Sequence, residues 1–380
     1  MKFSTKLIHN GNNIDPSTGA VSMPIYQSST FHQFDLANPS KFDYSRSGNP
    51  TRHGLENIMA QLEGGTDAYA FASGMAATSA VFSIFSFGDH IVCCQDVYGG
   101  TFRALEKIFS RFGISHTFVD ATNLDEIKNA IAPNTKAIFL ETPSNPLLRI
   151  TDIKGTVQIA KENNILTIID NTFMTPYLQR PISLGVDIII HSGTKFLSGH
   201  SDVLSGVVIT ATRQLGARIY QIQNGMGGVL GPQDCFLFIR GLKTLKVRLE
   251  EQQKTARILA QWFYDNNIAK KVYYPGLECH EGRQIHFNQA DGAGAVLSID
   301  FGNKEKAMHF MSSVTLAAVA VSLGGVETII SYPVMMSHAA MPVESREKLG
   351  ITEGLVRISV GLEDVNDLIE DFKNALTFNC

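Results

Sequence analysis

The sequence contains few cysteines and no long hydrophobic run. Its five cysteines, among 380 residues, show no CxxC spacing, so we expect reduced thiols and no disulfide framework. No stretch approaches the roughly 18 unbroken apolar residues of a membrane-spanning helix, and the opening MKFSTKLIHNGNN lacks the apolar segment of a secretion signal. These absences predict a cytoplasmic protein without a membrane partner.

An excess of charge of one sign is also lacking. The chain carries 32 basic and 36 acidic residues, a formal net charge of -4, and no block of like charges. A nucleic-acid-binding surface needs a basic patch, so no nucleic-acid partner is expected. The composition favours small molecules and further copies of the chain as partners.

Short apolar runs alternate with helical stretches through the middle of the chain. The runs are continuously apolar, which is typical of strands buried on both faces. This alternation predicts an α/β fold with a mostly parallel central sheet and helices on both faces, plus a smaller C-terminal α+β unit. The predicted strands of the central sheet are residues 90–94, 136–141, 165–170, 186–191 and 206–210.

The length of the chain favours more than one domain. Residues 1–50, rich in Ser, Asn, Pro and Gly, are expected to form an extended arm. Residues 51–243 would form the α/β domain, opening on a helix capped by Thr51. Residues 244–380 would form the smaller domain, and a long helical stretch at 236–267 would bridge the two. Further strands are expected around residues 294–302, 316–323 and 355–362.

Two charged residues lie at or just after predicted strands. Asp170 ends one strand, and Lys195 follows the next. Ligands of parallel sheets collect at the carboxyl ends of the strands. A partly buried lysine loses its proton readily and suits a Schiff-base amine, and a strand-end carboxylate suits a cationic ring nitrogen. Taken alone, Asp170 fits a helix cap and Lys195 fits a solvated surface charge.

A third feature is the turn Ser73–Gly74, followed by good helix formers. The first turn of such a helix offers free N–H groups to an anion, although a plain strand-to-helix turn has the same pattern. A phosphate-anchoring turn, an acid and a lysine on one α/β scaffold together describe pyridoxal 5'-phosphate. A nicotinamide cofactor is not expected, because the nearest approach to G-x-G-x-x-G, at 225–230, lacks the last glycine. No metal site is predicted.

With the motifs YSRSGNPT, SGMAA, ETPSNP, DNTF and HSGTKFLSGHSD in this order, the sequence resembles the Cys/Met-metabolism family of pyridoxal-phosphate enzymes, which have fold type I. The resemblance implies that Lys195 forms the Schiff base and that Asp170 pairs with the pyridinium nitrogen. It also implies that Tyr98 stacks on the ring and acts as an acid/base near the leaving group. The residues implied at the phosphate are Ser73, Gly74, Met75, Ser192 and Thr194.

The resemblance also concerns assembly. Tyr44 and Arg46 match a pair that reaches the phosphate of the adjacent subunit. This implies a homotetramer built from dimers with shared active sites.

Further residues are implied at the substrate. Arg357 matches an arginine that binds the substrate carboxylate, and Asn145 matches an asparagine near the ring oxygen and that carboxylate. Glu327 resembles an acid near the distal amino group of cystathionine. Thr328, where the family usually has Ser, and Arg103 are the remaining candidates for substrate binding.

Within the family, GGVLGPQD and RGLKTL are most similar to bacterial cystathionine γ-lyases. The expected reaction is γ-elimination of L-cystathionine to cysteine, 2-oxobutanoate and ammonia. Gly100 and Leu323 differ from residues common in methionine γ-lyases and cystathionine β-lyases. The alternatives are a cystathionine γ-synthase acting on O-acylhomoserine, a lyase with mixed β and γ activity, and a cofactor-binding sensor without turnover.

Overall fold

The computed structural model describes residues 1–10, 14–339 and 341–377, and its largest sheet has seven strands. They lie in the order β1-β7-β6-β5-β4-β2-β3. The five strands from β6 to β3 in this order each run parallel to the next, whereas β7 is antiparallel to both of its neighbours, β6 and β1. The predicted mostly parallel sheet is therefore confirmed. The strands are β1 (Asp67–Phe71), β2 (His90–Cys94), β3 (Ser115–Val119), β4 (Thr135–Glu141), β5 (Leu166–Asp170), β6 (Ile188–Ser192) and β7 (Gly206–Thr210).

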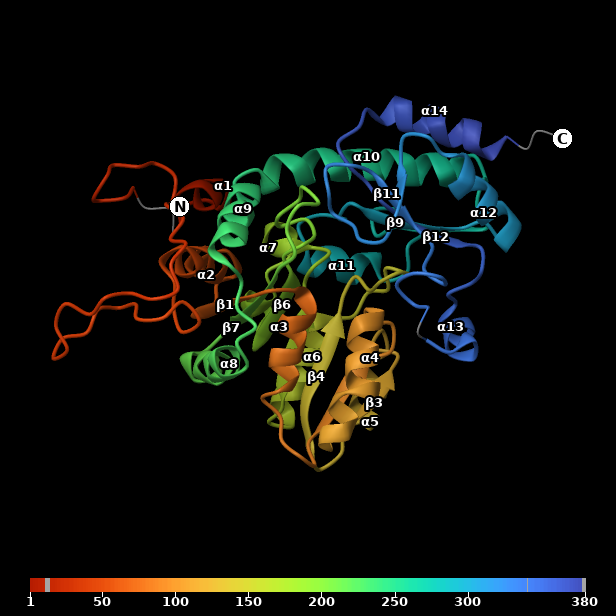
Figure 1. The fold of residues 1–380 in the computed structure, drawn as a ribbon. Coiled ribbons are helices and arrows are strands. Elements are labelled where there is room, and N and C mark those ends of the chain that lie inside the picture. Colours follow the sequence, from red (N-terminus) through yellow and green to blue (C-terminus); the bar gives the residue numbers. More distant parts are fainter. Residues whose placement is uncertain (11–13, 340, 378–380) are drawn as a thin grey trace.

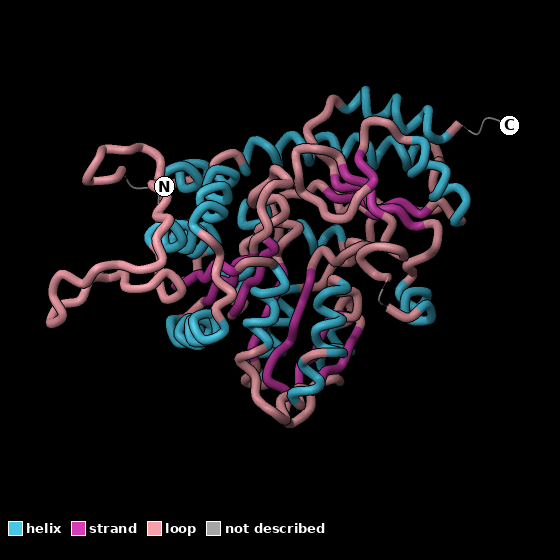
Figure 2. Tube along the Cα trace, in the orientation of Figure 1, coloured by secondary structure: helices cyan, strands magenta, loops and turns pink. Residues whose placement is uncertain are grey.

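Helices flank this sheet, which explains its continuously apolar strands (Figures 1 and 2). Ile188, Ile189 and Ile190 of β6 are fully buried, because α3 packs on β6 and β7 and α6 packs on β4 and β5. The helices of this part are α2 (Pro50–Glu63), α3 (Gly74–Phe82), α4 (Gly99–Lys107), α5 (Leu124–Asn129), α6 (Ile153–Glu162), α7 (Thr175–Leu178) and α8 (Arg213–Met226), with 3-10 turns at Phe109–Phe112 and Pro181–Leu184.

A second sheet, with the strand order β10-β11-β12-β9-β8, carries its own hydrophobic cluster. Of the stretch 316–323, only Ala318–Val319 forms a strand. The division into domains at residues 50/51 and 243/244 stays a prediction. The elements are β8 (Lys271–Tyr273), β9 (Val296–Asp300), β10 (Ala318–Val319), β11 (Ile329–Ser331), β12 (Leu355–Ser359), α11 (Arg283–Gln289), α12 (Lys304–Ser313), α13 (Val343–Leu349) and α14 (Val365–Leu376).

The predicted bridging helix at 236–267 is in fact two helices, α9 (Pro232–Leu242) and α10 (Leu245–Asp265). Arg248 of α10 donates to Gly241 O at 2.9 Å, which satisfies a carbonyl at the end of α9 where the helix breaks. Gln252 of α10 donates to Gly325 O at 2.8 Å. Figure 1 shows α10 passing above both sheets, so this helix links the two parts of the chain.

The N-terminal region differs from its prediction in two details. A short helix, α1 (Phe3–His9), lies within the arm. Asn49, not Thr51, caps α2, because its Oδ1 accepts from the N–H groups of Thr51 and Arg52 at 2.9 and 3.3 Å. The rest of the described arm extends away from the sheet (Figure 1).

Within the described residues, no helix is long and apolar enough to cross a membrane.

Candidate functional site

A cavity of about 400 Å³ lies at the carboxyl ends of β4, β5 and β6, where the second part of the chain faces the first. The last residues of these strands, Glu141, Asp170 and Ser192, line it. Most of the predicted site residues meet there. They are Ser73, Gly74, Met75, Tyr98, Asn145, Asp170, Ser192, Thr194, Lys195 and Arg357.

Lys195 lies in the turn after β6, and its Nζ donates to Ser322 Oγ at 2.6 Å. Burial lowers the pKa of Lys195 to about 8, the positive charge of Arg357 acts in the same direction, and Asp170 opposes them. The amine therefore loses its proton close to neutral pH, which a nucleophilic lysine requires.

Two carboxyl groups lie side by side at the ends of neighbouring strands, because Glu141 of β4 and Asp170 of β5 are register partners. Burial raises the pKa of both, and repulsion from Asp170 raises that of Glu141 further. Asp170 Oδ1 accepts from the N–H of Thr172 at 3.0 Å. A cation placed in the cavity beside Asp170 would favour the ionised form of its carboxyl group.

The start of α3 supplies the anion site. Ser73 caps the helix, since its Oγ accepts from the N–H of Ala76 at 3.1 Å. The N–H groups of Gly74 and Met75 belong to the first turn and have no acceptor within the helix. A Cβ on Gly74 would lie 2.8 Å from the Cβ of Ser192, so glycine lets β6 approach this turn closely.

The two predicted phosphate hydroxyls are not equivalent. Thr194 Oγ1 donates to Ser205 O at 3.2 Å and accepts from the N–H of Ser205 at 2.9 Å. Its proton is therefore already engaged within the protein. Ser192 lines the same cavity, while its backbone N–H donates to Thr172 Oγ1 at 2.8 Å.

Arg357 is a buried cation held by neutral acceptors. Its Nη1 donates to Asn145 Oδ1 at 2.8 Å and its Nη2 to Ser322 O at 2.6 Å, while its Nε has no partner. Burial lowers the pKa of Arg357 to about 10. A carboxylate in the cavity would supply the anionic partner that suits a guanidinium.

Tyr98 lies at the mouth of the cavity, where 41% of its surface is exposed. Its backbone N–H donates to Glu141 Oε2 at 2.8 Å. A Cβ on Gly100 would lie 2.5 Å from Cε1 of Tyr98 and 2.7 Å from Sδ of Met75, so the position of this ring depends on glycine there.

Five predicted residues do not line this cavity. The guanidinium of Arg46 lies 5.3 Å from the ring centroid of Tyr44, and both belong to the arm. Arg103 is exposed on α4, and Glu327 is exposed near Ser201 Oγ, at 3.4 Å.

The fifth, Thr328, is buried, and its Oγ1 donates to Glu363 Oε2 at 2.7 Å. This bond engages the hydroxyl of Thr328 within the protein, and its contact with the substrate stays a prediction.

Six polar residues of the cavity were not predicted from the sequence: Thr78, Glu141, Thr172, Ser322, Ser331 and Ser337. Glu141 ends its strand just as Asp170 does, so the same strand-end argument could have found it. Ser322 lies in a loop without a recognisable pattern, and only its contact with Lys195 reveals it.

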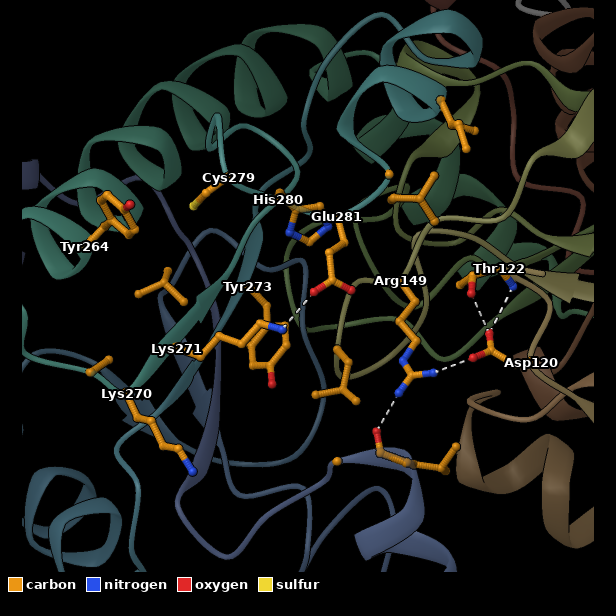
Figure 3. Close-up of a pocket in the computed structure, with 18 of the residues that line it drawn as sticks. Asp120, Thr122, Arg149, Tyr264, Lys270, Lys271, Tyr273, Cys279, His280 and Glu281 are labelled. Atoms are coloured by element: carbon orange, nitrogen blue, oxygen red, sulfur yellow. Dashed lines mark hydrogen bonds and ion pairs between the residues drawn. The ribbon is translucent and has the colours of Figure 1, made fainter.

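A larger cavity, of about 1090 Å³, lies elsewhere between the two parts of the chain (Figure 3). Two ion pairs lie in its wall. Arg149 Nη1 donates to Asp120 Oδ2 at 3.2 Å, and Lys271 Nζ lies 3.3 Å from Glu281 Oε1 (Figure 3). The smaller cavity holds the amine of shifted pKa and the free guanidinium nitrogen, so we assign the chemistry to it and not to the larger one.

The groups of the smaller cavity fit pyridoxal 5'-phosphate. They include a lysine amine of lowered pKa, a strand-end carboxyl for the ring nitrogen and free N–H groups at a helix start for the phosphate. No cluster of His, Cys, Asp or Glu suited to a metal ion occurs within residues 1–10, 14–339 and 341–377.

Comparison with known proteins agrees with this class. Residues 4–377 match the model of the family described as Cys/Met metabolism PLP-dependent enzyme. The chain is 57% identical over 374 residues to cystathionine beta-lyase MetC of Bacillus subtilis, covering 98% of this chain and 96% of that protein. It is 49% identical to cystathionine gamma-lyase of the same organism, covering 99% of each.

A solved structure, that of cystathionine gamma-lyase from Lactobacillus plantarum complexed with L-serine, has a TM-score of 0.96 at 43% identity, over 99% of this chain and 98% of that one. The fold and the site thus define an enzyme dependent on pyridoxal 5'-phosphate, with fold type I. The chain belongs to the Cys/Met metabolism PLP-dependent enzyme family, and it is a carbon–sulfur lyase of sulfur amino-acid metabolism.

Proposed function

We propose that this protein cleaves L-cystathionine, and that it breaks the bonds on both sides of the sulfur. Each cleavage consumes one water: γ-elimination gives cysteine, 2-oxobutanoate and ammonia, and β-elimination gives homocysteine, pyruvate and ammonia. The arrangement of Lys195, Asp170 and Arg357 around one cavity carries the proposal. The preference for γ-cleavage expected from the segments GGVLGPQD and RGLKTL, and from Leu323, is weakened, because the identity to a β-lyase exceeds that to a γ-lyase.

Pyridoxal 5'-phosphate, when bound, withdraws electrons from the α-carbon of an amino acid, which side chains alone cannot do. The protein residues hold it and move protons. Asp170 would keep the ring nitrogen protonated, and the N–H groups of Gly74 and Met75 with the hydroxyl of Ser192 would hold the phosphate. Thr194 would take part by exchanging its bond with Ser205.

The substrate would be oriented through its carboxylate. The Nε of Arg357 has no partner, and its hydrogen bonds to Asn145 and Ser322 can be exchanged for others, so the guanidinium can bind a carboxylate. The amine of Lys195 would take the α-proton, and the phenol of Tyr98 would donate a proton to the leaving thiolate. Glu327 and Arg103 stay predictions for the distal end of the substrate.

The proposal extends to assembly. Tyr44 and Arg46 would complete the phosphate site of a second copy, in a homotetramer built from dimers. Their positions on an extended arm, outside the cavity of their own chain, support this. The cytoplasmic location expected from the sequence stays a prediction.

The deciding experiment is a product assay with L-cystathionine on the protein loaded with pyridoxal 5'-phosphate. We expect both pyruvate and 2-oxobutanoate, and loss of both in Lys195→Ala. A parallel reaction with O-acylhomoserine and cysteine tests the synthase alternative. Absence of one keto acid with the unaltered enzyme would refute cleavage on both sides of the sulfur, and absence of both would refute the cleavage of cystathionine.

A further inference from the structure

We infer that Glu141 is a positioning residue, whose two carboxylate oxygens hold the loops of Tyr98 and Asn145 in one arrangement. The inference rests on the proposed function, in which these two residues act on the leaving group and the substrate. Nothing in the sequence patterns or the comparisons assigns a role to Glu141.

The contacts of Glu141 divide between two segments. Its Oε2 accepts from the backbone N–H of Tyr98 at 2.8 Å, and its Oε1 accepts from the backbone N–H of Asn145 at 3.2 Å. Tyr98 precedes α4, and Asn145 lies in the loop after β4. The contact with Tyr98 spans 43 residues of sequence, and the contact with Asn145 spans four. One side chain therefore ties the loop before α4 to the loop after β4.

The influence of Glu141 extends to the substrate arginine. Asn145, whose backbone Glu141 holds, accepts from Nη1 of Arg357 at 2.8 Å through its side chain. Glu141 thus helps to position two groups, the phenol of Tyr98 through the backbone of Tyr98 and the guanidinium of Arg357 through Asn145. Both groups line the cavity, and Glu141 is only 6% exposed.

A buried carboxylate beside Asp170 is unfavourable unless its hydrogen bonds compensate. Asp170 is its register partner, Asp96 is a further nearby acid, and Arg357 is the nearby cation. A neutral residue would avoid this repulsion, but glutamine has one acceptor oxygen and would set its NH₂ against a backbone N–H. The need for two acceptors explains why a carboxylate occupies this position.

Two substitutions separate the possible roles. Glu141→Gln keeps the length of the side chain and loses the charge and one acceptor. Glu141→Asp keeps the charge and both acceptors and loses the reach of one methylene. If Glu141 must hold both loops at once, both variants lose about 10- to 100-fold in kcat/KM, because each forfeits a buried hydrogen bond. We expect kcat to fall because Tyr98 is displaced, and KM to rise because Arg357 is displaced.

Asp371, which does not line the cavity, provides a matched control. It is also a buried carboxylate whose two oxygens accept from two backbone N–H groups, those of Thr315 and Leu316, at 2.8 and 3.1 Å. Asp371→Asn should lower the free energy of unfolding while leaving kcat and KM unchanged.

A readout without substrate keeps the test separate from the proposed function. The circular dichroism of the bound cofactor reports the orientation of its ring against Tyr98, and we expect it to change in both Glu141 variants but not in Asp371→Asn. If the unaltered enzyme does not cleave cystathionine, the proposed function fails, and the dichroism still decides the role of Glu141.

If Glu141→Asp has the activity and dichroism of the unaltered enzyme, Glu141 acts through its charge alone. If Glu141→Gln has them, Glu141 acts through packing alone. Either result overturns the inference. Should neither variant fold, hydrogen exchange of the unaltered holoenzyme, followed by mass spectrometry, replaces them. Slow exchange at the amides of Tyr98 and Asn145 is expected, and rapid exchange at either amide would overturn the inference.

Discussion

At the scale of single residues, the site depends on two cations whose hydrogen-bond acceptors are all neutral. The Nζ of Lys195 donates to a hydroxyl, and the guanidinium of Arg357 donates to an amide oxygen and a backbone carbonyl. Burial lowers the pKa of Lys195, and the positive charge of Arg357 lowers it further. The protein thereby keeps an amine that can react and a guanidinium that can accept an anion.

The pKa of Lys195 predicts how the cofactor-free protein captures pyridoxal 5'-phosphate. Only the uncharged amine attacks the aldehyde, so the rate should rise about tenfold per pH unit below about 8 and level off above it. Stopped-flow absorbance across this range measures the profile.

Variants test the causes of that profile. Arg357→Met removes a charge that lowers the pKa and should move the inflection to higher pH, whereas Asp170→Asn should move it to lower pH. An inflection near the usual lysine value of about 10.4 in the unaltered protein would contradict the burial argument.

At the scale of elements, the anion site exists because β7 and α3 approach each other closely. A Cβ on Gly206, the first residue of β7, would lie 2.2 Å from the carbonyl oxygen of Ser73. This carbonyl immediately precedes Gly74, so the strand sets the position of the helix start.

Gly206→Ala should therefore displace the N–H groups of Gly74 and Met75. We expect the affinity for pyridoxal 5'-phosphate to fall at least about tenfold, since small misplacements of such groups are costly. The free energy of unfolding should fall by about 1 to 3 kcal/mol. Cofactor titration and denaturant unfolding measure the two effects.

Gly225 is the control for this substitution. It is exposed in α8, and a Cβ there would meet no atom within 4 Å. Gly225→Ala should leave cofactor affinity unchanged and stabilise the helix by about 0.5 to 1 kcal/mol. Equal affinities in the two variants would show that the contact with Ser73 is unimportant.

At the scale of the whole molecule, the arm is the part that a single chain does not explain. Phe34 and Leu36 are each 87% exposed on it, and Tyr44 and Arg46 lie outside the cavity of their own chain. Apolar side chains on an extended segment favour contact with another copy.

Shared active sites predict complementation between two defective variants. Lys195→Ala and Arg46→Ala should each be impaired alone, yet a hybrid dimer has one site with both Lys195 and Arg46 intact. After dissociation and random reassociation of equal amounts, we expect activity in about a quarter of the sites. Activity of the mixture no higher than the mean of the separate variants would exclude sharing.

Much of the site followed from the sequence, and the exceptions have physical causes. Asp170 and Gly74 were predicted because one ends a strand and the other begins a helix, and Lys195 because it closely follows a strand. The assignment of the cap of α2 to Thr51 was wrong because Asn49, two residues earlier, reaches the same N–H groups. The predicted contact of Thr328 with the substrate stays a prediction, and the bond from its Oγ1 to Glu363, 35 residues later in the chain, follows no sequence pattern.

The sequence by itself determined the mostly parallel sheet and the chemistry of its edge, because strand patterns and strand-end residues depend on local periodicity and local backbone. Only the tertiary structure decided which groups face one another, such as Glu141 with Asp170 and Lys195 with Ser322. It also decided the pKa of Lys195, because burial and neighbouring charge come from segments distant in the chain.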